Sequence, residues 1–282
     1  MHPLIKKAAR RVLEVLDPVG RWKYRVSSGF DRPIPPMRMR TRTAARWAGK
    51  FVESGRRCAD ALEAALQETT GKRITDFQSI LDFGCGCGRT IMQWELPSLK
   101  RLTGCDVDGH AIAWLRSAYA KDPNLAFEPT RFDPPLPFPD QSFDLIYSVS
   151  IFSHLSGDDS QRWLAELARV TQGGGIALIT VQGPVALMKF HAAPDGGYWK
   201  DRVSEADLER EGFLFIPIPP QPGADAAPGI ESPTRKVEYG YTFMTRRHIE
   251  AAWHQPPWSV LGVFEGTVDG LQDVIVLRKI VR

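Results

Sequence analysis

Apolar positions near the start of the chain recur at helical spacing. Those between residues 3 and 16 fall on one side of a helix. Asp17-Pro18 predicts its end, because proline has no amide hydrogen to donate. An irregular proline-rich loop is expected over residues 27–36. A second helix is predicted over residues 43–69, with Gly55 as a point where it could break and Gly71 as its end.

Farther along, short apolar runs alternate with helical patterns. One helix is expected through Met92 and Trp94, a second with Ile112, Leu115 and Tyr119 on one side, and a third around Trp163 and residues 164–170. The runs expected as strands cover residues 79–83, 101–106, 127–132, 143–149 and 175–181. This alternation predicts βαβ units and therefore a parallel sheet.

The regular alternation stops after Val181. Residues 213–218 and 237–244 could pair as a hairpin, with a mobile loop expected over 217–229, and residues 259–264 and 273–279 should be antiparallel neighbours. We therefore predict an α/β protein whose seven-stranded, mostly parallel sheet ends in a C-terminal antiparallel hairpin. The expected units are N-terminal helices with a substrate-side loop, a cofactor-binding core, a cap insertion after strand five, and the closing hairpin, over residues 1–72, 73–183, 184–250 and 251–282.

Charge adds one feature to this picture. The 282 residues carry a formal net charge of +3, too small to suggest nucleic acid as a partner. Basic residues nevertheless crowd the first 46 positions. Such an arm could contact phosphate, an anionic lipid surface or an acidic substrate, or form a solvated helix face.

Four cysteines and the lack of long apolar runs bear on location. No run approaches the ~20 apolar residues that span a bilayer, and no secretory signal is evident at the N-terminus. Cys85 and Cys87 are too close for an ordinary disulfide, and no second Cys/His pair lies at zinc spacing, so we expect no metal site. These features predict a reduced, cytoplasmic protein. The oligomeric state is not predicted.

A glycine loop follows the first predicted strand. Residues 82–89 read Asp-Phe-Gly-Cys-Gly-Cys-Gly-Arg, with the acid two residues before the first glycine. The dinucleotide fingerprint G-x-G-x-x-G would need glycine where Arg89 stands. The spacing therefore favours a cofactor with a carboxylate, an ammonium and a sulfonium over one with a pyrophosphate.

Four blocks in order strengthen this interpretation: residues 81–88, 104–108, 136–146 and 166–175. Over residues 78–182 the chain resembles a class I S-adenosylmethionine-dependent methyltransferase. The resemblance implies a Rossmann-like core and S-adenosylmethionine as cofactor. It also implies an enzyme that transfers a methyl group.

The resemblance also implies cofactor-binding roles for particular residues. Gly84, Cys85, Gly86 and Gly88 would form the loop around the cofactor, with Asp82 orienting the loop or the cofactor's amino group. Asp106 would accept both ribose hydroxyls, since a carboxylate accepts two hydrogen bonds in one plane. Val107 would pack on the adenine, Phe132 or a neighbour would donate a backbone amide to it, and Ser148 and Val149 would present carbonyls to the methionine part. The family's acid for the adenine amino group is replaced by Arg131, with Asp133 two residues on.

Acceptor chemistry should lie just after the fourth strand. His154 is the candidate base, because an imidazole exchanges protons near neutrality; capping or positioning the loop is the alternative. Phe152 could wall the acceptor pocket or belong to the core. Tyr198, Trp199, Tyr239 and Tyr241 are candidate acceptor contacts, since each joins a flat apolar face to one polar atom.

The acceptor itself is the most open question. Through segments 26–29, 33–36 and 272–279 the whole chain resembles uncharacterised bacterial methyltransferases, which look like enzymes of surface-glycan or secondary-metabolite pathways. This implies a small-molecule or glycan acceptor, methylated on oxygen, or on nitrogen or sulfur. The alternatives are an RNA or protein methyltransferase, or a non-catalytic binding domain of the same fold. Residues 148–151 read Ser-Val-Ser-Ile and lack the Asn-Pro-Pro-Tyr-type motif of enzymes that methylate base amines.

Overall fold

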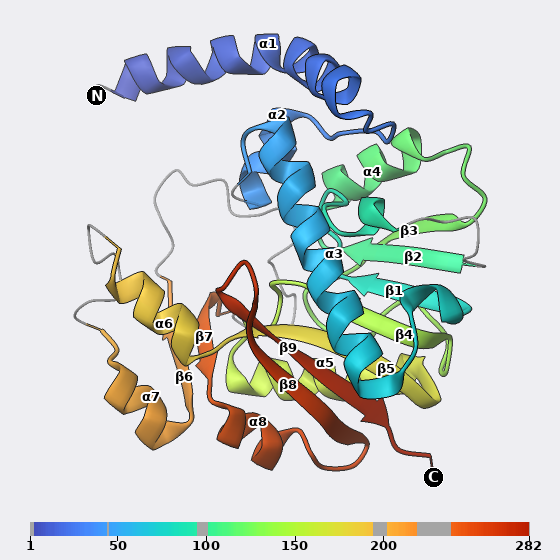
Figure 1. Ribbon diagram of the computed structural model, residues 1–282, viewed down its shortest axis with the longest axis vertical. Helices are drawn as coiled ribbons and strands as arrows, with labels where there is room; N and C mark the ends of the chain where they lie inside the picture. Colours follow the sequence, from blue (N-terminus) through green and yellow to red (C-terminus); the bar gives the residue numbers. More distant parts are fainter. Residues whose placement is uncertain (1–2, 44, 95–100, 194–201, 219–237, 282) are drawn as a thin grey trace.

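The computed structural model describes residues 3–43, 45–94, 101–193, 202–218 and 238–281. Its centre is one nine-stranded sheet with helices on both faces (Figure 1). The strands are β1 (Ser79–Phe83), β2 (Arg101–Asp106), β3 (Leu125–Pro129), β4 (Phe143–Ser148), β5 (Thr171–Gln182), β6 (Phe213–Pro217), β7 (Gly240–Met244), β8 (Trp258–Val268) and β9 (Gln272–Lys279). The α/β class predicted from the sequence is therefore confirmed.

Sheet order follows from the alternation of strands and helices. The run β3-β2-β1-β4-β5 is parallel throughout, and β9 then pairs antiparallel with β5 and with β8. The C-terminal hairpin thus completes the sheet as predicted. From β1 the chain adds β2 and β3 on one side, and it then returns to add β4 on the other side of β1. The carboxyl ends of β1 and β4 therefore face an open crevice, the usual ligand site in such sheets.

Two layers of helices cover the sheet. One core cluster packs α3 (Ala48–Thr70) and α4 (Gly109–Ala118) on one face, and a second packs α5 (Gly157–Val170) and α8 (Arg246–Ala252) on the other. Alternate strand residues supply the two faces: Ile80 and Leu145 belong to the first cluster, Leu81 and Ile146 to the second. This period of two is what a sheet buried on both faces requires.

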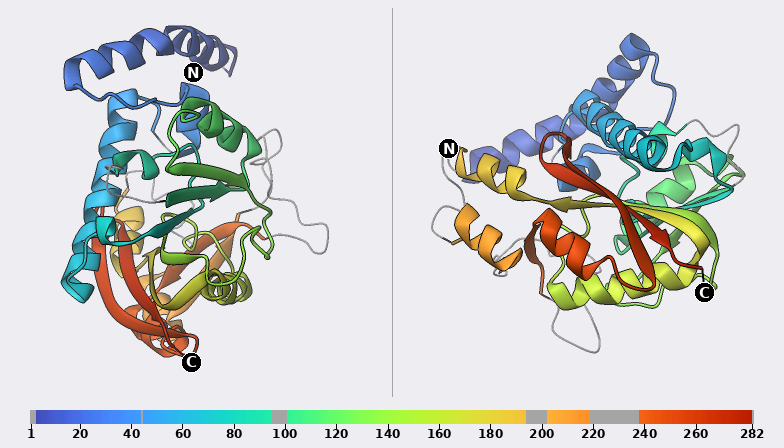
Figure 2. Two further views of the ribbon diagram at one scale, coloured as in Figure 1. Left: turned by 90° about the vertical axis from the view of Figure 1, so that its right-hand side faces the viewer. Right: turned by 60° about the horizontal axis from the view of Figure 1, so that its bottom comes forward.

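The predicted cap hairpin also belongs to the sheet, which raises the strand count from the expected seven to nine. β6 and β7 pair antiparallel, and Phe243 of β7 pairs with Gln182 at the end of β5. β5 extends three residues beyond Ile179, its last residue paired with β4. At Gln182, the last residue of β5, β7 covers the edge that β4 leaves open. The remaining helices of this region are α6 (Pro184–His191) and α7 (Glu205–Glu211), which flank the hairpin (Figure 2). Most of the mobile loop expected over 217–229 lies outside the described residues.

The first helix is longer than predicted. α1 spans Pro3–Ser28 and continues through Pro18. The Asp17 carboxylate accepts the Met37 amide at 3.0 Å and pairs with Arg21 at 3.0 Å and Arg40 at 2.5 Å. The tertiary contacts to Met37 and Arg40 hold the turn around Pro18 against a cost of ~3 kcal/mol for proline inside a helix. The sequence could not show them, because Arg40 lies 23 residues away.

Three smaller expectations also changed. Gly55 does not break α3, which ends as predicted at Gly71, with φ of 70°. The helix expected after the glycine loop is only the 3-10 turn η3 (Ile91–Gln93), where the Gln93 side chain donates to the Arg89 carbonyl at 3.2 Å. β3 ends at Pro129 because its partner β2 ends at Asp106. The short helices are α2 (Met37–Arg40), η1 (Thr41–Thr43) and η2 (Ile74–Asp76).

No helix within the described ranges is both long enough and apolar enough to cross a bilayer.

Candidate active site

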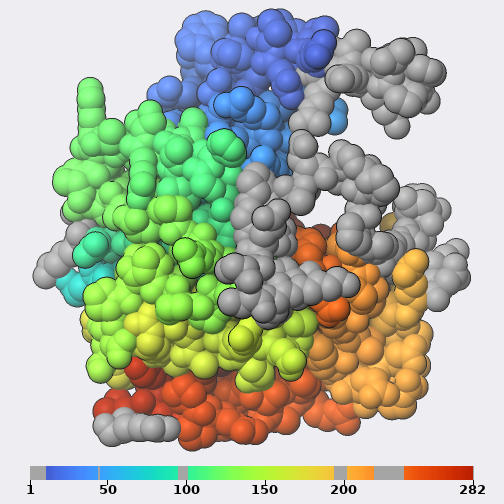
Figure 3. Space-filling model, turned by 180° about the vertical axis from the view of Figure 1, so that it is seen from behind, coloured from blue at the N-terminus to red at the C-terminus, as the bar shows by residue number. Residues whose placement is uncertain are grey.

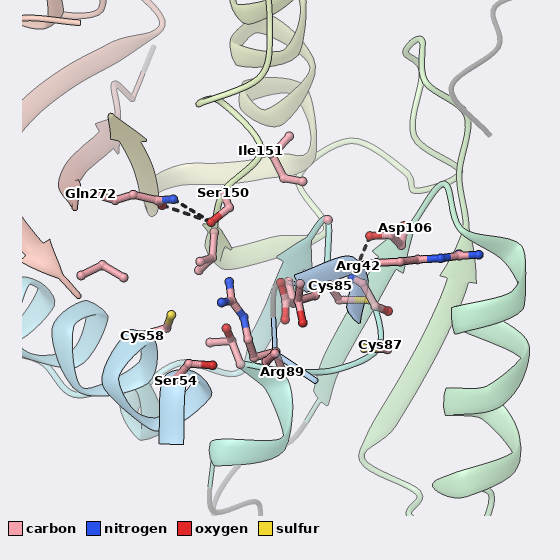
Figure 4. A pocket seen from close by; sticks show the side chains of 18 of the residues that line it. Arg42, Ser54, Cys58, Cys85, Cys87, Arg89, Asp106, Ser150, Ile151 and Gln272 are labelled. Carbon is pink, nitrogen blue, oxygen red and sulfur yellow. Dashed lines mark hydrogen bonds between the residues drawn. The ribbon is translucent and has the colours of Figure 1, made fainter. Parts of the chain in front are cut away.

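A cavity of about 710 Å³ opens at the carboxyl ends of β1 and β4 (Figure 4). Its size falls within the ~300–1,000 Å³ of small-molecule sites. The glycine loop forms its floor, and its walls come from η1, α3, the residues after β2 and β4, and the turn between β8 and β9. A smaller cavity of about 120 Å³ adjoins it and shares Asp106, Val107, Ile151, His154 and Tyr239 with it. Together they form one continuous site.

The glycine loop turns sharply beneath this cavity. Gly84, Gly86 and Gly88 have φ of 79°, 52° and 90°, in the left-handed region that side chains disfavour. At Gly84 a Cβ would also collide with the Ile151 side chain. The amides of Gly84 and Cys85 donate to the Cys105 carbonyl at 2.9 and 3.0 Å, which fixes the loop against the end of β2. The loop therefore presents backbone to the cavity.

The cysteines of this region are packing residues. All four cysteines of the chain are free and buried. Burial raises the pKa of the Cys87 thiol to about 12 and also raises that of Cys85. Neutral thiols are poor metal ligands. Across the described residues, no group of three His, Cys, Asp or Glu side chains could hold a metal.

Asp106 lies at the end of β2 and lines both cavities. Its carboxylate accepts the Gly86 amide and the Asp108 amide, each at 2.7 Å. Burial raises its pKa, and these two amides oppose that shift. Asp108 in turn caps α4 and pairs with Arg42. Asp106 is thus rigidly oriented, with its carboxylate in the wall of the cavity.

Asp82 is the buried acid of the site. Its side chain is only 2% exposed, and its Oδ2 atom has no hydrogen-bond partner within the part of the chain that the structure describes. The Tyr147 hydroxyl, which accepts the Trp94 indole N–H at 3.0 Å, hydrogen-bonds the carboxyl group. Burial raises the pKa of Asp82 to about 8. An orphaned carboxyl oxygen facing a cavity is a ready site for a ligand cation.

The end of β4 is strained. Ser150 has φ of 63°, and its amide donates to Thr180 Oγ1 at 2.8 Å. The Gln272 side-chain amide donates to Ser150 Oγ at 2.8 Å, which ties this turn to β9 (Figure 4). Val149 lines the cavity, whereas the Ser148 side chain is fully buried.

His154 faces both cavities. Its Nδ1 lies 2.8 Å from the Gly240 carbonyl oxygen. Because a carbonyl only accepts, Nδ1 carries the proton and Nε2 keeps a free lone pair. The Tyr239 ring stacks on the imidazole at 4.8 Å, and burial lowers the pKa of His154. The imidazole is therefore neutral and fixed in one tautomer at pH 7.

Other predicted residues divide between the site and the core. Tyr239 lines both cavities and Phe132 lines the smaller one, whereas Tyr241 packs against His154 from behind at 5.4 Å between ring centroids. Phe152 is fully buried against Trp253 and is not among the lining residues described, so the structure places it in the core. The predicted contacts Tyr198 and Trp199 lie outside the described residues.

Sequence reasoning missed the wall formed by α3. Ser54, Arg57 and Cys58 of this helix line the cavity, and so do Arg42 and Arg89 (Figure 4). Arg42 pairs with Asp108 and Arg57 with Asp269, but no ion pair joins Arg89 to any residue in the described ranges. The only signal of these lining residues in the sequence was Arg89, which interrupts the dinucleotide pattern. The site thus offers a free guanidinium, a buried carboxyl and an oriented carboxylate, which fit the carboxylate, ammonium and ribose of S-adenosylmethionine.

Comparisons with known proteins agree with this geometry. Residues 81–179 match the protein family described as "Methyltransferase domain". Over 149 residues the chain is 32% identical to the O-methyltransferase rstn1 of Aspergillus nomiae, covering 47% of this chain and 64% of that one. Over 129 residues it is 29% identical to the tRNA N(3)-cytidine methyltransferase METTL2 of Bos taurus, covering 43% and 34%. The chain thus spans less than two thirds of the length of either relative.

Among solved structures, the PH0226 protein of Pyrococcus horikoshii has a similar fold. The TM-score is 0.51 at 15% identity, over 78% of this chain and 88% of that one. The glycine loop, the oriented acid after β2 and the matched domain point to the same conclusion. Over the matched domain, residues 81–179, the chain is similar to methyltransferases, and this match supports S-adenosylmethionine as the cofactor.

Proposed function

We propose that this enzyme transfers the methyl group of S-adenosylmethionine to a hydroxyl oxygen of a small molecule. The observation that carries the proposal is the fixed tautomer of His154. A hydroxyl acceptor must lose a proton as it attacks, and a neutral imidazole with a free Nε2 lone pair can take it. The match to an enzyme named as an O-methyltransferase supports oxygen as the acceptor atom.

The chemistry is an in-line displacement. The bound cofactor supplies an electrophilic methyl group on a positively charged sulfur, and the leaving thioether is neutral. His154 Nε2 accepts the hydroxyl proton, and the Gly240 carbonyl stabilises the imidazolium through the Nδ1–H hydrogen bond. Tyr239 holds the ring in place by stacking. Alignment of reactants supplies much of the rate, ~7–11 kcal/mol in well-oriented systems.

We assign cofactor contacts on the same grounds. Asp106 would accept the ribose hydroxyls, Asp82 would hold the ammonium, and Arg89 would pair with the carboxylate of the methionine part. Val107, between the two cavities, would pack on the adenine. The backbone of Gly84, Cys85, Gly86 and Gly88 would line the methionine part, next to the carbonyls of Ser148 and Val149, and Phe132 would offer its amide to the adenine ring.

The acceptor would enter beside His154. Tyr239 and Tyr241 pack against this residue, and Tyr198 and Trp199 stay proposed acceptor contacts. Flat rings with one polar atom suit a phenol or a sugar. We propose a small molecule or a glycan unit as acceptor.

Location, source and domain organisation are proposals of the same kind. The four free cysteines support a reducing, cytoplasmic setting. The resemblance to uncharacterised bacterial methyltransferases supports a bacterial enzyme. The division at residues 72, 183 and 250 remains our proposed domain organisation.

Two measurements test the proposal. Calorimetric titration with S-adenosylmethionine and, separately, NADH is expected to give binding of the first alone. Methyl transfer from labelled cofactor to a panel of phenols and monosaccharides is then compared in wild type, His154→Ala and Tyr241→Phe. Loss of general-base catalysis lowers turnover by about 10²–10⁴-fold, so His154→Ala should lose activity while binding cofactor normally.

The pH dependence gives a second criterion. Because burial lowers the pKa of His154, the acid limb of kcat/KM should lie below pH 6.5 and disappear in the histidine variant. Turnover near wild type in His154→Ala would remove this residue as the base. Failure to bind S-adenosylmethionine would favour a non-catalytic domain instead.

RNA is the second candidate acceptor. The match to a tRNA methyltransferase and the basic residues near the N-terminus favour it. Phosphate contacts make affinity fall steeply with salt, so salt-dependent binding of tRNA followed by its methylation would establish this alternative.

A further inference from the structure

The side of α1 that faces the protein combines charged and apolar residues. Leu13, Asp17, Arg21 and Tyr24 are half-buried and recur at intervals of four, four and three residues, so they lie on one side of the helix. Asp17 pairs with Arg21 and Arg40, and Arg21 donates to the Ile34 carbonyl at 2.9 Å. The helix is therefore attached to the body by ion pairs, by hydrogen bonds and by the packing of Tyr24 against a core cluster. It lies across one end of the molecule, away from the sheet (Figures 1 and 2).

The opposite side of α1 is apolar and open to solvent. Its members share helical spacing and are 50–77% exposed. They are Val12, Val15, Leu16, Val19, Trp22 and Val26. We call this set the outer face of α1. In the space-filling view α1 forms the outermost edge of the molecule (Figure 3).

This arrangement inverts that of an ordinary surface helix, which buries its apolar side against the core. A contiguous row of exposed apolar side chains indicates a surface that is covered in the functional state. Single exposed residues need no such explanation, but here six lie together on one side.

The charge of α1 indicates which kind of partner covers its outer face. The segment Pro3–Ser28 contains seven basic and two acidic residues. Arg11 and Lys23, both exposed, stand beside the outer face. A second copy of the chain would bring two such helices of like charge together, which is unfavourable. RNA would match the charge, but its phosphates would leave the apolar row uncovered. An anionic bilayer surface would both cover the apolar row and match the positive charge. It accepts apolar side chains at the acyl boundary and attracts lysine and arginine.

We propose that α1 lies flat on an anionic lipid surface, with its outer face inserted and the exposed Arg11 and Lys23 at the headgroups. Trp22 suits this position, because indole rings favour the membrane interface. The helix would rest on the bilayer rather than cross it, since its other side carries the ion pairs to the body. Methyl transfer would then take place at the membrane surface, an inference independent of the acceptor proposed above.

The test is co-sedimentation of the full chain with lipid vesicles. One set is pure phosphatidylcholine, and the other contains about a third phosphatidylserine. We expect at least tenfold tighter binding to the anionic vesicles, weakened by added salt. Val15→Glu with Val19→Glu should abolish binding, and Lys23→Glu should weaken it. The matched control is Met188→Glu on α6. Met188 is 51% exposed, and this substitution should leave vesicle binding unchanged.

The readouts separate the possible occupants. Circular dichroism and S-adenosylmethionine affinity should be unchanged in all these variants, because the replaced side chains make no core contacts. Equal binding to both vesicle sets, no binding to either, or full binding by the Val15/Val19 variant would overturn the proposal. So would a dimer formed without lipid and lost in that variant, which would assign the outer face to a second copy. Lipid-independent tRNA binding that competes with the vesicles would assign α1 to RNA instead.

Discussion

Replacing Gly55 by alanine tests how α3 and the glycine loop fit together. Gly55 is buried in α3, and a Cβ built there would collide with the carbonyl oxygen of Arg89 and lie 2.8 Å from Gln93 Nε2. Ordinary contacts begin at 3.4 Å, so the helix and the Arg89 carbonyl would have to separate by roughly 1.4 Å. The variant therefore moves a residue that we place in the cofactor site, although Gly55 is not among the cavity-lining residues described.

The expected change in the free energy of unfolding follows from two opposed effects. Alanine favours a helix over glycine by about 1 kcal/mol. Overpacking a rigid contact costs about 1–3 kcal/mol, and here the obstacle is backbone, which yields poorly. We expect net destabilisation of about 1–2 kcal/mol, or a Tm lower by roughly 2–8 °C for a chain of this size. Weaker S-adenosylmethionine binding should accompany it, because Arg89 shifts.

The matched control is Gly20→Ala in α1. A Cβ at Gly20 has open space within 4 Å, so alanine should only add helix propensity. Thermal unfolding and calorimetric titration of both variants give the result. If Gly55→Ala were as stable as wild type and bound the cofactor equally well, the close contact between α3 and the loop would be refuted.

Three further outcomes are expected. Asp106→Ala should weaken S-adenosylmethionine binding at least tenfold by calorimetry, a loss of about 1.4 kcal/mol, and unchanged affinity would remove the ribose assignment. Burial raises the pKa of Asp82 to about 8, so this carboxyl is mainly protonated at pH 7. Binding of the cofactor's ammonium should ionise the carboxyl and release its proton. Affinity should then rise between pH 6 and 8, and calorimetry in two buffers should show no such proton release in Asp82→Asn. Phe152→Leu should lower the unfolding free energy by about 1–2 kcal/mol with acceptor KM unchanged, whereas a raised KM would return Phe152 to the acceptor pocket.

Local pattern was enough to predict the central sheet. The strand before the glycine loop, residues 79–83, and the second strand, 101–106, have the predicted bounds. The reason is that buried parallel strands are short apolar runs ended by turn residues, a signal contained within a few neighbouring positions. The glycine spacing and Asp106 are equally local, and they gave the cofactor class.

Other features were decided only by contacts distant in sequence. The tautomer of His154 depends on Gly240, 86 residues away, and the cavity wall of α3 depends on how Gly55 meets Arg89. The continuation of α1 through Pro18 depends on Asp17 pairing with Arg40. Periodicity revealed an amphipathic first helix but not which side faces the protein. That choice was made by the ion pairs of Asp17 and the packing of Tyr24, because a helix docks by the face that finds partners, and the partners are set by the tertiary structure.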